Sequence, residues 1–345
     1  VPVVAGENDF TAYAFNRDNV KSADALLELR GADSLRRVPT THVLAVGVNE
    51  YENPHYNLKF AVADATDFVS EVKRQRTLIE PGGKIESAML VNKEATKGNI
   101  GTALRRLSGA ETGPLAAGTP KALETLTRAE PEDVVVVYFA GHGTAQQNRF
   151  YLIPHDLGYT GEINVKTEFS LKSILDHSLN DVEMEALFEP INASQLLFVI
   201  DACNSGQALE AEEKRRGPMN SKGLAQLAYE KGMYILTAAQ SYQLANEAAA
   251  LGHGFLTYVL VEEGLKKGQA DSVAARDGQI MVREWFDYAA ERVPRLHMER
   301  VKQKRGLGVV FTGEKDVQRP RTFYRREMDS RPLVIAQRDA ARTGQ

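Results

Sequence analysis

A cysteine and a histidine, each at the end of an apolar stretch, are the residues of this chain best suited to chemistry. Cys203 is the single cysteine and lies in the segment DACNSG at residues 201–206. His142 lies in the segment FAGHG at residues 139–143. A thiol beside an imidazole is the minimal machinery for nucleophilic acyl transfer, because the imidazole takes the thiol proton and the thiolate attacks a carbonyl.

The glycine after His142 has its own use in such chemistry. Gly143 has no Cβ, so the backbone there is able to approach a substrate closely. We expect the N–H groups of Gly143 and Cys203 to bind the developing oxyanion. Losing one such donor costs on the order of 3–4 kcal/mol of transition-state stabilisation in a well-studied protease.

The elements that must position these residues form an α/β pattern. Several apolar runs are uninterrupted, which indicates strands buried on both faces of a parallel sheet. Helical patterns separate several of these runs, so we predict a layered α/β sandwich with a mostly parallel sheet of about six strands. If the strands before His142 and Cys203 are neighbours, both residues face one cleft at the carboxyl edge of the sheet. The expected strands are 42–48, 85–91, 133–141, 196–201 and 233–240, with an edge strand at 308–311, and the expected helices are 60–79, 97–107, 254–265 and 282–293.

Composition excludes several classes of protein. The chain has 345 residues, 42 Lys and Arg against 46 Asp and Glu, and a formal net charge of −4. This balance argues against a globally basic nucleic-acid binder. The basic stretch 295–331 is interpreted as a solvated face, with binding to nucleic acid or to an acidic partner as the alternative. With one cysteine, no intrachain disulfide or cysteine-based zinc cluster forms. We also find no convincing metal-ligand spacing of His, Asp and Glu.

No run of residues has the length and apolarity of a membrane span, and no signal peptide is recognisable. We therefore expect a cytoplasmic protein without a membrane partner. The chain begins at Val1 rather than Met, so it is treated as a candidate fragment of a longer protein.

The paired segments carry a family resemblance. FAGHG, with its histidine 61 positions before the cysteine of DACNSG, resembles the caspase-like cysteine peptidases, and DACNSG is closest to metacaspases and the bacterial orthocaspases. The resemblance covers about residues 40–270, including VLAVGVNEY, LKFAVADA, RFYLIPHD and GFLTYVL. It implies a caspase-like three-layer fold, Cys203 as nucleophile and His142 as base.

The same resemblance bears on cofactors and on the parent protein. It implies no cofactor for the chemistry. Some metacaspases require calcium, but we cannot locate such a site here residue by residue. Some bacterial caspase-family proteins carry a WD-repeat propeller before this domain, so a WD-repeat region is an expected segment of the parent protein.

In metacaspases the residue at the position of Asp201 forms the acidic floor of the pocket for the substrate residue before the scissile bond. Asp64, in the pattern AVADA, matches the second carboxylate of that pocket. Two carboxylates select a cation, so the resemblance implies cleavage after Arg or Lys. Ala140 stands where metacaspases often have a hydroxyl, which leaves the preference between Lys and Arg open.

Each of these residues also has a simpler interpretation. Cys203 alone could be an inert buried thiol, and His142 a loop histidine with its hydrogen bonds satisfied. Asp201 could simply end a strand, and Asp64 could be a favourable charge in the first turn of a helix. His253 lies in a second Gly-His-Gly segment, and we assign it to the start of the following helix rather than to catalysis.

We divide the chain into an N-terminal extension (1–38, a candidate end of a preceding domain), a peptidase domain (39–313) and a basic C-terminal tail (314–345). The charged segment 207–223 is interpreted as an exposed loop, the usual place for proteolytic nicking. In caspases the same stretch separates two subunits, so Arg215, Arg216 and Lys222 are candidate self-processing sites. The alternative is a solvated linker that never reaches the active site.

The preferred function is therefore a cysteine endopeptidase that cleaves after Arg or Lys. One alternative is a catalytically silent caspase-like module for interaction or signalling. Another is a different cysteine hydrolase built on a similar sheet.

Overall fold

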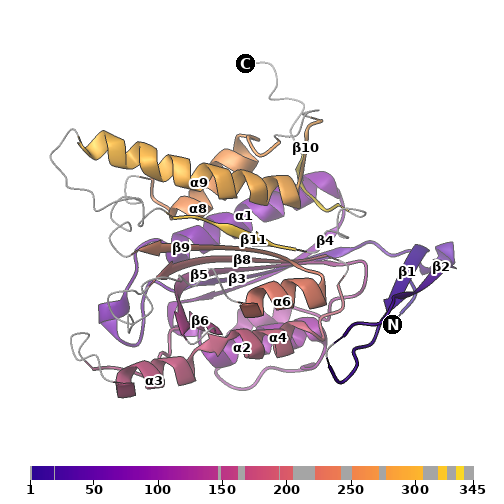
Figure 1. The fold of residues 1–345 in the computed structure, drawn as a ribbon, viewed down its shortest axis with the longest axis horizontal. Helices are drawn as coiled ribbons and strands as arrows, with labels where there is room; N and C mark the ends of the chain where they lie inside the picture. Colours follow the sequence, from indigo (N-terminus) through magenta and orange to yellow (C-terminus); the bar gives the residue numbers. More distant parts are fainter. Residues whose placement is uncertain are drawn as a thin grey trace.

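The protein is a sheet covered by helices on both faces, with a separate N-terminal hairpin (Figure 1). The computed structural model describes residues 2–18, 20–146, 149–161, 168–193, 195–204, 222–241, 251–271, 277–305, 318–324 and 332–337.

The main sheet has the strand order β11-β9-β8-β5-β3-β4, and β6 and β7 extend it beside β5. β3 pairs in parallel with β4 and β5, and β8 pairs in parallel with β5 and β9. Only the short strand β11 at the edge of this main order runs antiparallel to its neighbour. The prediction of a mostly parallel sheet is confirmed. The strand bounds are β3 Thr40–Gly47, β4 Lys84–Val91, β5 Val134–Gln146, β6 Arg149–Ile153, β7 Leu179–Asn180, β8 Gln195–Asn204, β9 Tyr234–Ser241 and β11 Arg321–Phe323.

Two helical layers enclose the sheet (Figure 1). One layer contains α1 (Ala61–Ile79), α8 (Phe255–Thr257) with the π-helical segment Tyr258–Lys266 that continues it, and α9 (Val282–Arg305). The other contains α2 (Lys97–Ser108), α3 (Glu168–His177), α4 (Asp181–Phe188) and α6 (Lys222–Lys231). Every helix within the described part of the chain is too short or too polar to cross a membrane.

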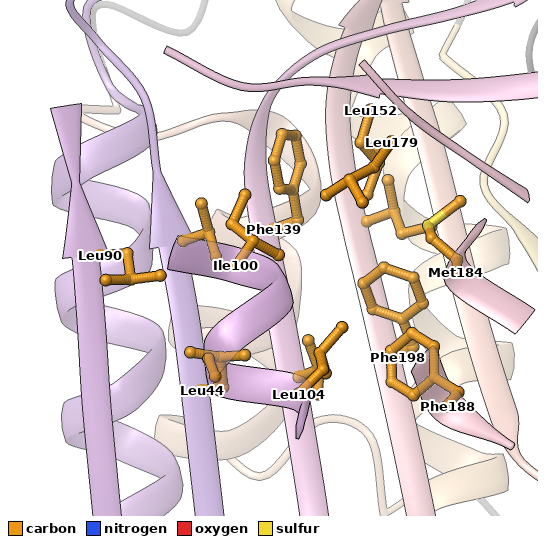
Figure 2. Close-up of a cluster of buried hydrophobic side chains, with 14 of the residues drawn as sticks. Leu44, Leu90, Ile100, Leu104, Phe139, Leu152, Leu179, Met184, Phe188 and Phe198 are labelled. Atoms are coloured by element: carbon orange, nitrogen blue, oxygen red, sulfur yellow. The ribbon is translucent and has the colours of Figure 1, made fainter. Parts of the chain in front are cut away.

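The alternation of side chains along each central strand divides the apolar core between the two faces. On β3, Leu44 and Val46 belong to the cluster beneath α2 and α4, whereas Val43 and Ala45 belong to the cluster beneath α1 and α9. Figure 2 shows part of the first cluster, where Leu44, Leu90 and Leu104 lie together. Burial on both faces explains why these strands are apolar at every position.

The segment FAGHG lies inside β5 and not beyond its end, which differs from the prediction. β3 ends at Gly47, opposite Ala140, so the edge of β5 beyond this point is free to pair with another strand. β6 pairs there in antiparallel register, with His142 opposite Ile153. This pairing carries β5 through Gln146, and β8 likewise runs through Asn204.

The C-terminal residues contribute strands to the fold. β11 lies at the edge of the sheet beside β9, and β12 (Val334–Gln337) pairs with β10 (Gln279–Met281). Both β11 and β12 fall in the stretch expected to be a basic tail. A guanidinium nitrogen of Arg76 on α1 donates to the carbonyl of Val334 at 3.1 Å, which ties β12 to the helical layer. The edge strand expected at 308–311 lies outside the described residues.

The N-terminal extension forms a two-stranded antiparallel hairpin of β1 (Gly6–Ala12) and β2 (Ala25–Gly31). Its apolar side chains are largely exposed, and Leu26 has a relative exposure of 73%. The hairpin therefore adds few buried apolar side chains to the core, and the division of the chain at residue 38 remains a prediction.

Candidate active site

His142 and Cys203 occupy directly opposed positions on neighbouring parallel strands. β5 and β8 pair in parallel, and the register sets His142 opposite Cys203 and Gly143 opposite Asn204. Adjacent strands lie about 4.8 Å apart, so the two backbones are as close as a sheet permits. The condition stated from the sequence, that these two strands be neighbours, is met.

The imidazole of His142 is buried and held by two tyrosines. Its Nε2 lies 2.7 Å from the backbone carbonyl oxygen of Tyr56. The hydroxyl of Tyr51 accepts the backbone N–H of His142 at 2.7 Å, and the two rings lie 5.0 Å apart. A carbonyl only accepts, so we assign the Nε2 proton to this hydrogen bond, which makes Nδ1 the basic nitrogen of the neutral ring.

A short turn after β3 positions both tyrosines. Asn57 Oδ1 accepts the Tyr51 N–H at 2.8 Å, and Asn53 Oδ1 accepts the His55 N–H at 3.1 Å. The 3₁₀ turn Pro54–Tyr56 follows directly. The sequence analysis recognised only a turn here. The missed signal is that the turn follows the carboxyl end of a parallel strand, the edge at which the His142 segment also lies.

Packing accounts for the two glycines around His142. A Cβ on Gly141 would lie 2.9 Å from the Tyr51 hydroxyl, and a Cβ on Gly143 would lie 2.9 Å from the Cβ of Ala202. Both positions therefore need glycine before any substrate is considered. Gly143 pairs with β6 on one side and β8 on the other. An oxyanion role for the N–H groups of Gly143 and Cys203 remains a prediction.

The structure brings Asp64 and Asp201 together, and we call these two residues the acidic pair. A Cβ on Gly254 would lie 2.9 Å from Asp201 Oδ2 and 3.1 Å from Asp64 Oδ2, so the two carboxylates flank this glycine. Both are buried. Burial raises the pKa of Asp64, whereas burial and the charge of Asp64 together raise the pKa of Asp201 to about 7. A role in substrate binding is untested by this geometry.

The hydroxyl beside Asp201 comes from Thr257 on α8. Thr257 Oγ1 donates to Asp201 Oδ2 at 2.8 Å and its backbone N–H donates at 3.3 Å. The Tyr138 hydroxyl lies 2.6 Å from Thr257 Oγ1. Ala140 is buried in the apolar cluster beneath α1. The hydroxyl next to Asp201 thus comes from an element far away in the sequence and not from position 140.

His253 precedes α8, as expected, but it also contacts Asp64 of the acidic pair. Its Nδ1 lies 2.9 Å from Asp64 Oδ1, and its Nε2 lies 3.1 Å from Asp67 Oδ2. The hydrogen bond with Asp64 raises the pKa of His253 above its ordinary value. The sequence analysis missed this contact. The second Gly-His-Gly segment was the available signal, but its spacing does not reveal which helix it meets.

Within the described residues, Asp67, His253 and Glu262 are the group that could hold a metal ion, with one ligand atom of each within 4.8 Å of the others. Their side chains already have charged partners, since Glu262 pairs with Lys266 and Asp67 with His253. The sequence analysis found no convincing metal-ligand spacing because Asp67 lies far along the chain from the other two residues.

The structure corrects the prediction of the processing loop at Lys222. Lys222 is the first residue of α6, so the bond after it lies in a helix and not in the exposed loop that was predicted. Proteolytic nicking favours exposed loop tips, which disfavours this site. Arg215 and Arg216 lie outside the described residues.

The protein-family comparison matches the caspase domain model over residues 40–304. This span is most of the chain, and the chain belongs to the caspase-domain family. The match agrees with the parallel sheet and its two helical layers.

Solved structures give more distant similarities. Protein GSU0716 from Geobacter sulfurreducens is 15% identical with a TM-score of 0.45, covering 83% of this chain and 93% of that one. The structure described as pro-sf-caspase-1 is 11% identical with a TM-score of 0.37, covering 83% and 91% respectively. No curated protein matches the sequence.

Proposed function

We propose that this protein is a cysteine endopeptidase that cleaves after Arg or Lys through a Cys203–His142 dyad. The observation that carries the proposal is the register of β5 and β8, which sets the only thiol of the chain opposite a buried histidine in a caspase domain. A thiol and an imidazole on adjacent strands are the two groups that acyl transfer needs.

In the proposed reaction, Nδ1 of His142 takes the Cys203 thiol proton, since the Nε2 proton is held by the Tyr56 carbonyl. The thiolate attacks the substrate carbonyl, and backbone N–H groups of Gly143 and Cys203 stabilise the oxyanion. The imidazolium then protonates the leaving amine as the peptide bond breaks, which leaves a thioester. Water, deprotonated by His142, hydrolyses the thioester and restores the thiol.

The acidic pair supports the substrate class. Asp64 and Asp201 approach the same glycine, so a cationic side chain would gain charge-assisted hydrogen bonds there. An acidic side chain would meet like charges, at a cost of several kcal/mol. The proposed bond cleavage itself uses Cys203 and His142 and requires no cofactor.

Fluorogenic peptides ending in Arg, Lys and Asp test this proposal, with Cys203→Ala as the matched control. We expect Arg and Lys peptides to be cleaved and the Asp peptide to be rejected. A failure to cleave any of the three would favour the silent interaction module. Efficient cleavage of the Asp peptide would contradict the acidic substrate site.

A further inference from the structure

The two members of the acidic pair are bonded differently. Asp64 uses both of its oxygens: Oδ1 lies 2.9 Å from Nδ1 of His253, and the Gly254 N–H donates to both oxygens at 3.1 Å. Asp201 accepts two hydrogen bonds, both from Thr257 and both at Oδ2. Asp201 Oδ1 has no hydrogen-bond partner among the described residues. Both oxygens of Asp64 therefore accept hydrogen bonds within the protein, whereas Oδ1 of Asp201 accepts none from the described residues.

Carboxylates surround the imidazole ring of His253. Its ring faces Asp64 and Asp67 on α1, and the carboxylate of Glu262 lies nearby on the π-helical segment. Lys266 pairs with Glu262 and offsets that charge. The two ring nitrogens lie 2.9 Å and 3.1 Å from carboxylate oxygens, which only accept hydrogen bonds, so both nitrogens carry protons and the ring is an imidazolium. The raised pKa of His253 agrees with this geometry. A protonated His253 places one positive charge between Asp64 and Asp67.

We propose that His253 is the internal counter-ion of Asp64, so that Asp201 alone provides the negative charge that receives the substrate's Arg or Lys side chain. This inference rests on the proposed function and refines it. His253 and Asp64 are then positioning residues, because they hold Gly254 between the carboxylates without touching the substrate cation. In this arrangement Asp64 faces a cationic side chain of the protein, whereas Asp201 is bonded by the neutral Thr257.

Binding to an inactive chain tests the assignment separately from turnover. The Cys203→Ala protein is titrated by calorimetry at pH 8 with an Arg-ending peptide and with the same peptide ending in norleucine. The Arg-over-norleucine ratio isolates the contribution of the cation. We expect Asp201→Asn to reduce this ratio about tenfold or more, the loss typical of a hydrogen bond to a charged group.

In the same assay Asp64→Asn should change the ratio by less than about threefold, because both Asp64 oxygens already accept hydrogen bonds from His253 and Gly254. Asp176→Asn, an exposed carboxylate on α3, is the matched control and should leave the ratio unchanged. An equal or larger loss in Asp64→Asn than in Asp201→Asn overturns the assignment. An Arg-over-norleucine ratio near one in the parent overturns both this inference and the proposed substrate class.

NMR titration of the histidine ring protons supplies a second readout. The His253 signal, identified by its absence in His253→Asn, should titrate above the ordinary value of 6.5 and move down in Asp64→Asn. Saturation with the Arg peptide should leave the His253 pKa in place. A fall on peptide binding would mean that the substrate takes Asp64 from His253, which contradicts the proposal.

The reciprocal test follows the pKa of Asp64 through the NMR signal of its carboxyl carbon. In His253→Asn a side-chain donor remains near Asp64 but the positive charge is gone, so the Asp64 pKa should rise. An unchanged Asp64 pKa shows that His253 is not its counter-ion. A wild-type protein that binds Arg peptides selectively and never cleaves them would refute the proposed peptidase activity while leaving the counter-ion assignment standing.

Discussion

The backbone carbonyl of Tyr56 lies 2.7 Å from Nε2 of His142. This contact assigns the Nε2 proton to the Tyr56 carbonyl and leaves Nδ1 as the basic nitrogen of the neutral ring. The acceptor is a backbone atom, so no substitution of the Tyr56 side chain removes it directly. His142 itself is therefore the informative residue to change.

We expect His142→Ala to lower turnover of Arg peptides by about 10²-fold to 10⁴-fold or more, since general acid–base catalysis is lost together with positioning. Steady-state kinetics measure the effect. His253→Ala should retain far more turnover, and its effect should fall on KM. If the larger loss in kcat came from His253→Ala, the assignment of the base to His142 would be wrong.

Cys203→Ala should abolish peptide cleavage, because no other thiol exists in the chain. The substitution removes one small group, so the free energy of unfolding should change by only about 1 kcal/mol. Peptide assays and urea denaturation measure the two effects. Turnover that persists in pure Cys203→Ala protein would refute the nucleophile assignment.

Selectivity for Arg should depend on pH through Asp201, whose pKa is raised to about 7. Below this pH the carboxyl is protonated and neutral, and above it the carboxylate attracts a cation. The ratio of kcat/KM for Arg and norleucine peptides should therefore rise as the pH passes through about 7. Titration of the dyad cancels in this ratio. A ratio that stays constant between pH 5 and pH 9 in the wild type would contradict a role for Asp201. In Asp201→Asn the ratio should stay constant, because the titrating carboxyl is absent.

The same carboxyl should reduce stability at high pH. Its folded pKa lies above its unfolded value of 3.8, so the folded chain binds more protons and unfolding becomes easier as the pH rises from about 4 to about 7. The Tm of Asp201→Asn minus that of wild type should therefore grow between pH 4 and pH 7. Differential scanning calorimetry measures it, and a difference that shrinks over this interval would contradict the buried, raised carboxyl.

A second buried charge cluster, at the opposite end of β3, should control acid stability. His42 is buried with Nδ1 3.1 Å from Glu86 and Nε2 3.3 Å from Asp133. Burial alone would raise the pKa of Glu86, but hydrogen bonds from Lys84 and Thr127 and the charge of His42 lower it overall. The pKa of Asp133 is likewise lowered overall. Burial would raise it, but hydrogen bonds from His42 and from backbone N–H groups outweigh that effect.

Carboxylates with lowered pKa values stabilise the fold above their unfolded values of 4.5 and 3.8, and this stability is lost as the pH falls further. His42→Ala removes the partner that the two carboxylates share, while Glu86 keeps Lys84 and Asp133 keeps Arg37, so we expect a loss of about 1–3 kcal/mol. Urea denaturation at pH 7 measures it. An exposed control, His177→Ala, should change the free energy of unfolding by less than about 0.5 kcal/mol.

Self-processing should occur after Arg215 or Arg216 and not after Lys222. The first turn of α6 holds Lys222 in helical backbone, whereas a peptidase needs an accessible segment. Intact-mass analysis after prolonged incubation should show slow nicking in the active protein and none in Cys203→Ala. A single uncut mass from enzyme that still cleaves peptides would show that the loop is not a processing site.

The strands and their parallel arrangement were predictable because burial on both faces requires apolar residues at every position, as in β3, β5 and β8. The helices α1 and α2 begin and end within one residue of their predicted limits, because their apolar faces repeat with the helical period. The adjacency of His142 and Cys203 was stated only as a condition on strand order, and the structure meets that condition. The information that predicted the strands and helices is local in the sequence.

Tertiary structure alone decided the partners of the chemical groups. Tyr56 meets His142, Thr257 meets Asp201 and His253 meets Asp64 across long stretches of sequence. No periodicity records such contacts, because each depends on how a turn or helix start is docked against the sheet. The extension of β5 through His142 has the same origin, since it required β3 to end early enough for β6 to pair. Hydrophobic patterning determines which elements form, whereas hydrogen-bond geometry between distant elements determines which charged groups meet.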